Sequence, residues 1–371
     1  MTKILCIHYF DVNDGNPKFN AISYHRILQP HRVLSRLTGW EVHHVPSAKG
    51  LTDEFLKEFN LVIFLRFIDD LTICDRLRSL GIKFGVDEDD YWVLHDKHIA
   101  KQAYDTSGLT QKIIDSIKVS DFVITTTPIL AGKIKPFNPN VFIIENGIDT
   151  LDKSWQPNKE PNNRVRFGFL GGSTHFHDIY KISHDITRSM YDKQFQNKCQ
   201  VALAHSYREG EPSVYIGYEK IITDHFKSLP FQYRKELLQG SNPDGTNQYY
   251  RRLQFKPVEE FGHLYNQIDI SVSPLENNEF NNCKSELKML EAGFMDCAIM
   301  LNDVNPYSMI ANKDNSFIFE RGDFYYWFKY IMKNPNAIAD KKAALKETVS
   351  KYDLSILSLK RKELYENWIA M

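Results

Sequence analysis

The chain has 371 residues, a length that fits two α/β domains better than a single core. Hydrophobic residues make up 42% of the sequence and charged residues 25%, which excludes a largely disordered chain and predicts a packed globular fold. With 46 basic and 47 acidic residues the formal net charge is −1, so no global field would hold a polyanion, and nucleic acid would need a local basic patch.

Cysteine usage and hydropathy indicate the compartment that we expect. The cysteines are scattered, without a C-x-x-C pair, at Cys6, Cys74, Cys199, Cys283 and Cys297. This spacing predicts neither a zinc site nor a disulfide framework and favours a reducing, cytoplasmic setting. The segment Met1–Ile7 is typical of a buried first strand rather than of a signal peptide, and no run approaches the ~20 apolar residues of a transmembrane segment.

In the first half, short apolar runs alternate with longer amphipathic stretches, the pattern of βαβ units around a parallel sheet. The expected strands are Lys3–His8, Trp40–Val45, Leu61–Leu65, Lys83–Val86, Phe122–Thr125 and Val141–Ile144. A loop over Asp11–Asn20, which contains Gly15, is expected between the first strand and a helix over Ile22–Leu37. The helical periodicity places Ile27, Leu34 and Leu37 on an apolar side and Arg26, Arg32 and Arg36 elsewhere.

Four carboxylates follow the fourth expected strand: Asp87, Glu88, Asp89 and Asp90. Ligands of parallel sheets bind at the carboxyl ends of the strands, so position alone makes these residues site candidates. In that place Asp87 and Asp89 could orient a substrate hydroxyl or act as a base. The alternative is a solvated acidic turn that caps the next helix. Arg66, which follows the strand Leu61–Leu65, is a candidate cation at the same edge.

The pattern stops over Asp152–Asn163, a linker-like stretch with two prolines, and restarts with a strand over Val165–Leu170. Further strands are expected at Gln200–Ala204, Leu253–Phe255, Asp269–Val272, Ala298–Leu301 and Ser316–Phe319. The tail from Ala337 to Met371 has a helical pattern throughout. We therefore expect a first domain over residues 1–155, a second over 156–355, and a C-terminal helix over 356–371 that returns to the first.

A segment longer than a simple crossover, Ser206–Arg252, separates two of these strands. It carries Tyr207, Arg208, Tyr249, Tyr250, Arg251 and Arg252. Long insertions in compact domains are often functional, and the alternative is a solvated loop and helix.

The strand Val165–Leu170 runs into a glycine-rich turn, Gly171-Gly172-Ser173-Thr174-His175. Glycine permits close approach of the backbone, so that N–H groups can meet a phosphate without a Cβ in the way. His175 or His177 could donate a hydrogen bond to phosphate or sugar, and the alternative for each is a structural histidine.

The segment Phe280–Gly293 has helical periodicity. On a continuous helix, Cys283, Leu287, Leu290 and Phe294 would form a core face, while Lys284, Lys288 and Glu291 would share a stripe near the helix N-terminus. Two ammonium groups and a carboxylate there suit a nucleotide diphosphate, with the cations on the phosphates and the carboxylate on the ribose. The alternative is a solvated face on which Lys288 and Glu291 form an i,i+3 ion pair.

The stretch Asn282–Ala292, after Asp269–Leu275, resembles the donor-site motif of glycosyltransferase family four, in which two glutamates are separated by seven residues and followed by alanine. Glu291 matches the second glutamate, which in the family binds the nucleotide ribose. Cys283 replaces the first, which lies near the sugar. The resemblance implies donor-binding roles for Asn282, Lys284 and Ser285, with Lys284 at the diphosphate or sugar.

The glycine-rich turn opens the second expected domain, where the family places its phosphate loop. The resemblance therefore adds Gly171, Gly172, Ser173, Thr174 and His175 to the donor-binding set. Phe142–Asp149 resembles the strand-to-linker passage before the hinge. The implied fold class is α/β with two Rossmann-like domains and a cleft between them, the GT-B architecture.

Ser23–Pro30 resembles the first loop and helix of bacterial and phage-type glycosyltransferases, in which a serine or glycine loop and an arginine face the cleft. The acceptor-binding residues implied in the first half are Gly15, Ser23, Tyr24, Arg26, Arg66 and Asp90. Asp87, Asp89 and Lys284 are the expected catalytic residues.

The implied reaction transfers a sugar from a UDP- or GDP-sugar co-substrate to an acceptor hydroxyl, with retention of anomeric configuration. No resident cofactor is expected. An aspartate–any–aspartate triplet also resembles the metal-binding signature of GT-A enzymes, but two α/β halves fit GT-B, so no metal is expected. The alternatives are a nucleotide-sugar epimerase of the same fold and an inactive sugar- or nucleotide-binding module.

The acceptor stays open between two kinds: a glycan or small metabolite, and a hydroxymethylated base in phage DNA. DNA would require local cations and extrusion of the base from its stack. The candidate cations are Arg26, Arg32, Arg36, Arg66, Arg251, Arg252 and Lys256, with Tyr249 and Tyr250 beside the last three.

Overall fold

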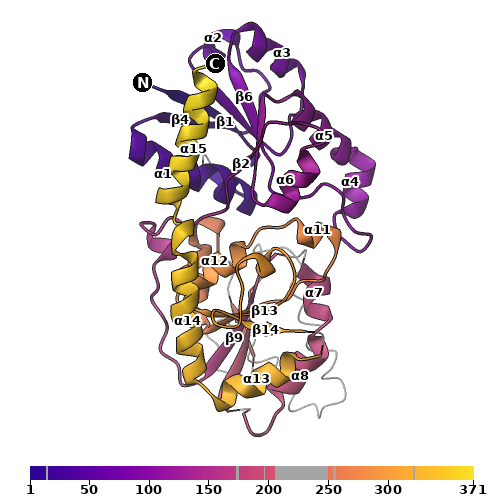
Figure 1. Cartoon of the computed structure of the whole chain (residues 1–371), viewed down its shortest axis with the longest axis vertical. Coiled ribbons are helices and arrows are strands. Elements are labelled where there is room, and N and C mark those ends of the chain that lie inside the picture. Colours follow the sequence, from indigo (N-terminus) through magenta and orange to yellow (C-terminus); the bar gives the residue numbers. More distant parts are fainter. Residues whose placement is uncertain (14–15, 173–174, 196, 205–249, 254–255, 321) are drawn as a thin grey trace. The chain divides into compact units, whose positions relative to one another are not determined.

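A computed structural model of the chain describes residues 1–13, 16–172, 175–195, 197–204, 250–253, 256–320 and 322–371 (Figure 1). The chain packs as two compact units. The first comprises Met1–Thr150, Asn278–Leu287 and Lys351–Met371, and the second comprises Leu151–Asn277 and Lys288–Ser350. Among the described residues, no helix has the length and apolar character needed to cross a membrane.

The first unit is built on a six-stranded parallel sheet in the order β4-β1-β5-β6-β7-β8. The strands are β1 (Lys3–Ile7), β4 (Glu41–Val45), β5 (Leu61–Leu65), β6 (Lys83–Asp87), β7 (Phe122–Thr125) and β8 (Val141–Ile143). All six expected strands are therefore confirmed, with β5 and β7 at the predicted bounds. Each is a short apolar run bounded by polar residues, which is the sequence pattern of a buried parallel strand.

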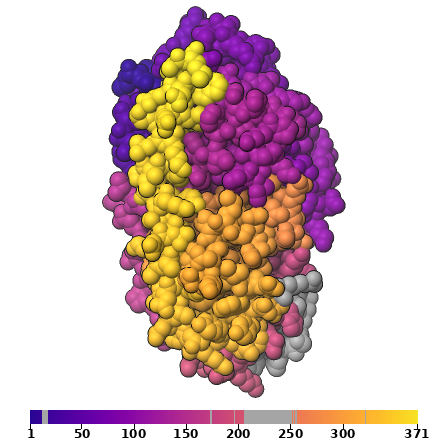
Figure 2. Space-filling model, in the orientation of Figure 1, coloured from indigo at the N-terminus to yellow at the C-terminus, as the bar shows by residue number. Residues whose placement is uncertain are grey.

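Helices cover both faces of this sheet. On one face, α2 (Asp53–Leu56) and α3 (Thr72–Ser79) pack their buried leucine and isoleucine side chains on Leu5, Val62 and Phe84. On the other face, the C-terminal helix α15 (Leu354–Ile369) lies beside α1 (Gln29–Thr38), where the Ser358 hydroxyl donates a hydrogen bond to the Pro30 carbonyl at 3.2 Å. Figure 2 shows α15 in yellow along the outside of this unit.

Gly85 in β6 is required by a close approach under α15. A Cβ at this position would lie 2.4 Å from the Phe122 ring, which itself stacks on Trp368 of α15 at a centroid distance of 5.0 Å. Real Cβ contacts are never so short, so any larger residue here would displace the aromatic pair.

The second unit repeats the architecture with the order β11-β10-β9-β12-β13-β14. Its strands are β9 (Val165–Leu170), β10 (Cys199–Ala204), β11 (Tyr250–Leu253), β12 (Ile270–Ser273), β13 (Ala298–Asn302) and β14 (Phe317–Phe319). The prediction for β9 is confirmed to the residue, whereas β11 begins three residues before its predicted start. The core lies between this sheet and the helices α8 (Ser183–Met190) and α13 (Phe324–Lys333).

The structure corrects the loop expected over Asp11–Asn20. Strands β2 (Phe10–Asn13) and β3 (Asn16–Phe19) form an antiparallel hairpin in which Phe10 pairs with Phe19. The two rings lie 5.2 Å apart, and Phe10 also contacts the His8 ring at 5.0 Å, so aromatic packing holds the hairpin at the end of β1.

The helix expected over Ile22–Leu37 exists, but its predicted faces are partly wrong. It begins with a π-helical stretch, η1 (Ser23–Leu28), before α1. A π turn holds more residues than an α turn, so a wheel drawn at 100° per residue misplaces side chains across it. Arg26, expected on the polar side, is 1% exposed, and Leu37, expected in the core, is 45% exposed.

The continuous helix expected over Phe280–Gly293 is also wrong. The chain forms α11 (Glu279–Asn282), a turn over residues 283–286, and then α12 (Leu287–Phe294). Cys283 packs in the core of the first unit with Trp92 and Ile113. Lys284 therefore precedes α12 and does not share its helical stripe with Lys288 and Glu291.

The tail expected to be helical throughout is interrupted once. α14 (Asn336–Val349) and the 3₁₀ turn η7 (Ser350–Tyr352) are followed by Asp353, whose side chain accepts a hydrogen bond from the Ser355 backbone N–H and caps α15. The break coincides with the passage of the chain from the second unit back to the first.

Candidate functional site

The strand order of the second unit places a candidate ligand site between β9 and β12. From β9 the chain moves outward in one direction through β10 and β11, and from β12 it moves in the other through β13 and β14. Such a reversal leaves a crevice at the carboxyl ends of the two central strands, where α/β sheets bind their ligands. Gly171 follows β9 at this edge, and Ser273 ends β12.

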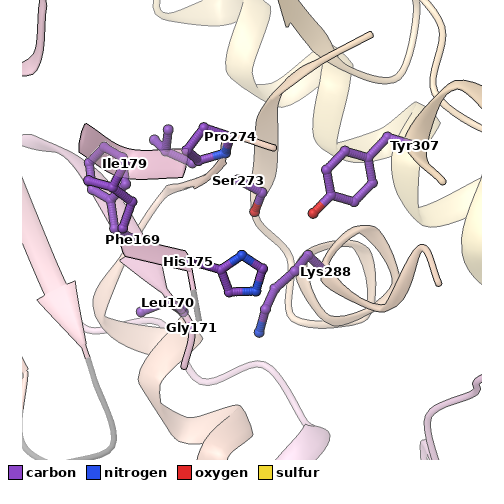
Figure 3. Close-up of a pocket in the computed structure, with 10 residues that line it drawn as sticks. Phe169, Leu170, Gly171, His175, Ile179, Ser273, Pro274, Lys288 and Tyr307 are labelled. Carbon is purple, nitrogen blue, oxygen red and sulfur yellow. The ribbon is translucent and has the colours of Figure 1, made fainter. Parts of the chain in front are cut away.

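A pocket is present at this reversal (Figure 3). Its lining residues come from β9, the turn after it, α7 (Phe176–Tyr180), β12, α12 and the 3₁₀ turn η6 (Tyr307–Met309): Phe169, Leu170, Gly171, His175, Ile179, Val272, Ser273, Pro274, Lys288 and Tyr307. Figure 3 shows the His175 ring and the Lys288 side chain next to each other in the pocket, with Ser273 and Tyr307 also lining it. A cation and an imidazole at strand ends suit a phosphate-bearing ligand.

Glu291 is held beside this pocket by two donors. The Lys288 ammonium donates to Glu291 Oε2 at 2.8 Å, and the Tyr265 hydroxyl donates to the same oxygen at 2.7 Å. Tyr265 comes from η5 (Val258–Gln267) and is fully buried; burial and the Glu291 carboxylate raise the pKa of this phenol well above its ordinary value, so it stays a donor. The i,i+3 ion pair of Lys288 and Glu291, the alternative considered for this stripe, is present.

His175 is fixed by a second carboxylate. Its Nδ1 lies 2.9 Å from Asp178 Oδ2, and the other oxygen of Asp178 accepts a hydrogen bond from the Glu276 backbone N–H at 2.7 Å. Asp178, Ser273 and Tyr307 were not among the residues predicted to form the site, whereas Lys288 belongs to the stripe predicted to meet the diphosphate. The signal that could have found Asp178 is its spacing three residues after His175 at the start of a short helix.

The donor-binding residues expected from the sequence divide between the two units. Gly171 and His175 line the pocket of the second unit, Gly172 follows Gly171 and is exposed, and Ser173 and Thr174 lie outside the described residues. Asn282, Lys284 and Ser285 pack in the first unit. There the Lys284 ammonium lies 5.0 Å from the centre of the Phe280 ring, a cation–π contact.

In the first unit, Asp87 lies in a buried network. The fully buried carboxylate accepts hydrogen bonds from Arg26 Nε at 2.7 Å and Nη2 at 3.2 Å, and from Arg361 Nη1 at 3.2 Å. Arg26 Nη1 also donates to Asn146 Oδ1 at 3.0 Å, and Asn146 donates to the Ser285 hydroxyl at 2.7 Å. Two guanidinium groups thus occupy both oxygens of Asp87, which leaves this carboxylate poorly placed to accept a substrate proton.

A second polar cluster surrounds Arg66 at the carboxyl ends of β5 and β6. Arg66 has a left-handed backbone, with φ of 66°, and its guanidinium lies 3.4 Å from Glu88 Oε1 and donates to the Tyr104 hydroxyl at 2.9 Å. Burial raises the pKa of Glu88 to about 8 and that of Asp89 to about 7. Arg66, whose own pKa is raised by these carboxylates, remains a cation.

Several buried oxygens at these strand ends have no hydrogen-bond partner within the described part of the chain. They are Glu88 Oε2, Asp89 Oδ1 and the hydroxyls of Thr125 and Thr126. Glu88 and Asp89 directly follow β6, and Thr125 and Thr126 lie at the end of the neighbouring β7. Buried oxygens are normally satisfied, so this edge is suited to donors from a bound polar molecule.

The remaining acceptor-side predictions fall into three groups. Ser23 and Tyr24 are fully buried, the Ser23 hydroxyl donating to the Tyr9 carbonyl at 2.8 Å and the Tyr24 hydroxyl accepting from Gln29 at 2.6 Å, so both have structural contacts. Asp90 is partly exposed and lies 3.9 Å from Arg66. Gly15 lies outside the described residues.

Most of the cations considered for DNA have an acidic partner. Arg36 bonds Asp149 at 2.9 Å, Arg251 bonds Glu160 at 3.0 Å, and Lys256 bonds Glu260 at 3.0 Å, in addition to the pairs of Arg26 and Arg66. Arg32 is exposed. Tyr249 and the side chains of Tyr250 and Arg252 are not described.

The cysteines in the described ranges are free and buried, and no cluster of His, Cys, Asp or Glu within those ranges could hold a metal ion. No protein-family model matches the chain, and no curated protein matches it in sequence.

Solved structures do resemble it. A sucrose-phosphate synthase from Thermosynechococcus elongatus aligns with a TM-score of 0.68 and 12% identity, covering 100% of both chains. An α-glucosyltransferase in complex with UDP-glucose and DNA containing an abasic site aligns with a TM-score of 0.63 and 10% identity, covering 98% of this chain and 99% of that one. Anabaena HepE in complex with UDP aligns with a TM-score of 0.59 and 9% identity, covering 99% and 100%. The chain therefore has the two-domain α/β GT-B fold of these glycosyltransferases.

Proposed function

We propose that this protein is a glycosyltransferase that binds a nucleotide diphosphate-sugar in the pocket between β9 and β12. The observation that carries the proposal is the convergence of His175 and Lys288 at the strand reversal, with Glu291 held beside them by Tyr265. Lys288 and His175 would bind the diphosphate, and Glu291 the ribose hydroxyls. The UDP and UDP-glucose in the similar structures support a uridine nucleotide as the first choice over GDP.

In the proposed reaction, the bond between the anomeric carbon and the diphosphate oxygen breaks, and the acceptor oxygen bonds to that carbon. The nucleoside diphosphate leaves with its negative charge stabilised by Lys288 and His175. We include retention of configuration and kinship with glycosyltransferase family four in the proposal, on the strength of the Glu291 motif.

Of the two predicted carboxylates, Asp89 is the better choice to orient the acceptor hydroxyl and take its proton. Asp87 is occupied by Arg26 and Arg361, whereas Asp89 has an oxygen with no hydrogen-bond partner among the residues that the structure describes. Because burial raises the pKa of Asp89 to about 7, it can exchange a proton near neutral pH. The unpartnered oxygens around it suit the hydroxyls of a sugar or other polyol.

We propose a glycan or small metabolite as the acceptor rather than DNA. Five of the seven cations considered for DNA form ion pairs with carboxylates, which lowers the local positive charge that phosphates would require. A gel-shift titration with duplex DNA at two salt concentrations tests this choice. We expect no binding at low salt; salt-sensitive binding that Arg32→Ala weakens would make DNA the acceptor.

The donor assignment is tested by thermal shift with UDP, GDP, UDP-sugars and uridine, because a ligand that binds only the folded state raises its stability. We expect UDP and a UDP-sugar to raise Tm and Lys288→Met to abolish the effect. If no nucleotide raises the Tm of the wild type, the donor site is wrong. If UDP is released only when an acceptor is present, the protein is a transferase. If the sugar is converted without an acceptor, the protein is an epimerase. If the nucleotide-sugar binds without any turnover, the protein is an inactive binding module.

A further inference from the structure

His175 could line the pocket without a partner, but its side chain is paired with Asp178 in a specific geometry. Asp178 is 5% exposed, and its carboxylate is fixed from two sides, by His175 Nδ1 at 2.9 Å and by the Glu276 N–H at 2.7 Å. Since Glu276 lies in the loop that follows β12, the contact ties the start of α7 to the strand end on the opposite side of the pocket.

The glycine at position 171 leaves room for the imidazole. A Cβ at Gly171 would lie 3.3 Å from His175 Cδ2, so any side chain there would crowd the ring. Because Nδ1 faces Asp178, Nε2 is the nitrogen on the opposite side of the ring. Figure 3 shows one ring nitrogen on the side of the Lys288 side chain, within the pocket.

Several charged and titratable groups of the described ranges line the pocket with His175 or pair with its lining residues. They are Asp178 on α7, Lys288 with its partner Glu291 on α12, Tyr307 on η6, and Glu276, whose side chain forms an ion pair with Lys181. Asp178 favours an imidazolium, and Lys288 opposes it. A bound diphosphate would add negative charge next to Nε2 and shift this balance toward the imidazolium.

We propose that Asp178 is a positioning residue that holds His175 with Nε2 toward the donor diphosphate, so that diphosphate binding takes up one proton at His175. The inference rests on the proposed function, because it assigns a role inside the proposed donor pocket. A neutral ring with its proton on Nδ1 presents a lone pair at Nε2, which repels a phosphate oxygen. The imidazolium instead donates a charge-assisted hydrogen bond from Nε2.

The experiment is isothermal titration of the full chain with UDP, and with uridine as the ligand that lacks the diphosphate. Titrations between pH 6 and pH 9, each in two buffers of different ionisation enthalpy, give both Kd and the number of protons taken up. For the wild type we expect uptake approaching one proton with UDP and none with uridine, and UDP affinity that falls by up to tenfold per pH unit once His175 must be protonated on binding.

In Asp178→Asn we expect UDP affinity at pH 7 to fall at least fivefold and proton uptake to decrease, with uridine affinity unchanged. His175→Gln should abolish the uptake in both backgrounds, and the double variant should lose no more affinity than His175→Gln alone. The matched control is a second His–Asp pair, His184 and Asp185 on α8, 3.8 Å apart with the His184 side chain 80% exposed. His184→Gln and Asp185→Asn should bind UDP as the wild type does.

Three results would overturn the proposal: unchanged uptake and affinity in Asp178→Asn, uptake that persists in His175→Gln, or an equal loss of uridine and UDP affinity in Asp178→Asn, which would indicate a structural role. If Asp178→Asn does not fold, Asp178→Glu and His175→Gln supply the same comparison. A wild type that binds neither UDP nor any nucleotide would contradict the proposed function itself, and is thereby distinguished from a failure of the Asp178 assignment.

Discussion

The Tyr265 hydroxyl and the Lys288 ammonium donate to the same oxygen of Glu291, at 2.7 Å and 2.8 Å. One donor comes from η5 and the other from the same helix as the carboxylate, so Glu291 is oriented from outside its own helix as well as from within. The proposed ribose contact therefore depends on a phenol that no motif would have named.

Tyr265→Phe should weaken UDP binding without abolishing it. Removal of the hydroxyl leaves the buried Glu291 oxygen with Lys288 as its remaining donor from this pair, and a lost hydrogen bond to a charged group typically costs about 1.5–3 kcal/mol. We expect a comparable loss in the free energy of urea unfolding and a several-fold higher Kd for UDP. Tyr326→Phe, at a residue that is 61% exposed, is the matched control and should change neither quantity. Wild-type affinity in Tyr265→Phe would remove Glu291 from the proposed ribose site.

Asp87→Asn should destabilise the protein more than it alters any chemical step. Neutralising this carboxylate leaves Arg26 and Arg361 as unpaired buried cations, and loss of one partner of a buried ion pair typically costs about 3–5 kcal/mol. Urea unfolding should show the loss. Asp89→Asn is the comparison: it should retain most of the stability and lose turnover. A stable, inactive Asp87→Asn variant would restore Asp87 as the catalytic carboxylate.

Stability should fall as pH rises from 6.5 to 8.5. Burial raises the pKa of Glu88 from 4.5 to about 8, so the folded state binds the proton more tightly than the unfolded state, and this contribution is lost as pH rises through 8. Glu286 and Asp89, each raised to about 7, act in the same direction.

The buried histidines act in the opposite direction and in another window. Burial lowers the pKa of His8 to about 3 and of His44 to about 4, so their contribution to the free energy of unfolding is fully present above pH 6.5 and is lost as pH falls toward these values.

Urea unfolding of Glu88→Gln between pH 6.5 and 8.5 isolates the effect of the Glu88 carboxyl. The stability of this variant should decline less over that range than the stability of the wild type. The control is Glu58→Gln, at a side chain that is 55% exposed, and its stability should follow the wild-type pH profile. If Glu88→Gln also followed the wild-type profile, Glu88 would be ionised throughout this pH range and the prediction would be wrong.

Two neighbouring glycines provide a test of the turn after β9. A methyl group at Gly171 would lie 3.3 Å from His175 Cδ2, whereas one at Gly172 would meet no atom of the described residues within 4 Å apart from its chain neighbours. Gly171→Ala should therefore displace the imidazole and raise the Kd for UDP severalfold, with little change in Tm. If only Gly172→Ala loses affinity, the ligand itself lies against Gly172 and His175 does not contact it.

The strands could be predicted because each is a short apolar run whose neighbours are polar, and β5, β7 and β9 match their predicted bounds. The two helices that mattered most for the site could not be predicted as well, because each departs from regular α geometry. A π-helical stretch moves Arg26 into the core, and the turn after Cys283 removes Lys284 from the helix of Glu291. Wheel projections assume an unbroken helix and fail at both places.

The partners of the predicted residues were missed for a different reason. Arg26 and Asp87 are 61 positions apart, and Tyr265 and Glu291 are 26 apart, so only the folded chain brings them together. The hairpin β2–β3 has a local sequence signal, because Asp-Gly at positions 14 and 15 is one of the favoured hairpin dipeptides, but the polar residues around it favour a loop. No comparable local signal marks Asp178 as the partner of His175 beyond their spacing.

The first unit is completed only by the C-terminal segment of the chain, and this order affects folding during synthesis. Asp87 leaves the ribosome 274 residues before Arg361, which belongs to a helix that only the last part of the chain supplies. At about 5–20 residues per second, the interval between the two is about 15–50 seconds. Throughout that interval the sheet of β1 and β4–β8 lacks the helix that stacks Trp368 on Phe122. A nascent chain shortened by even its last helix would therefore leave an apolar sheet face uncovered and vulnerable to aggregation during synthesis.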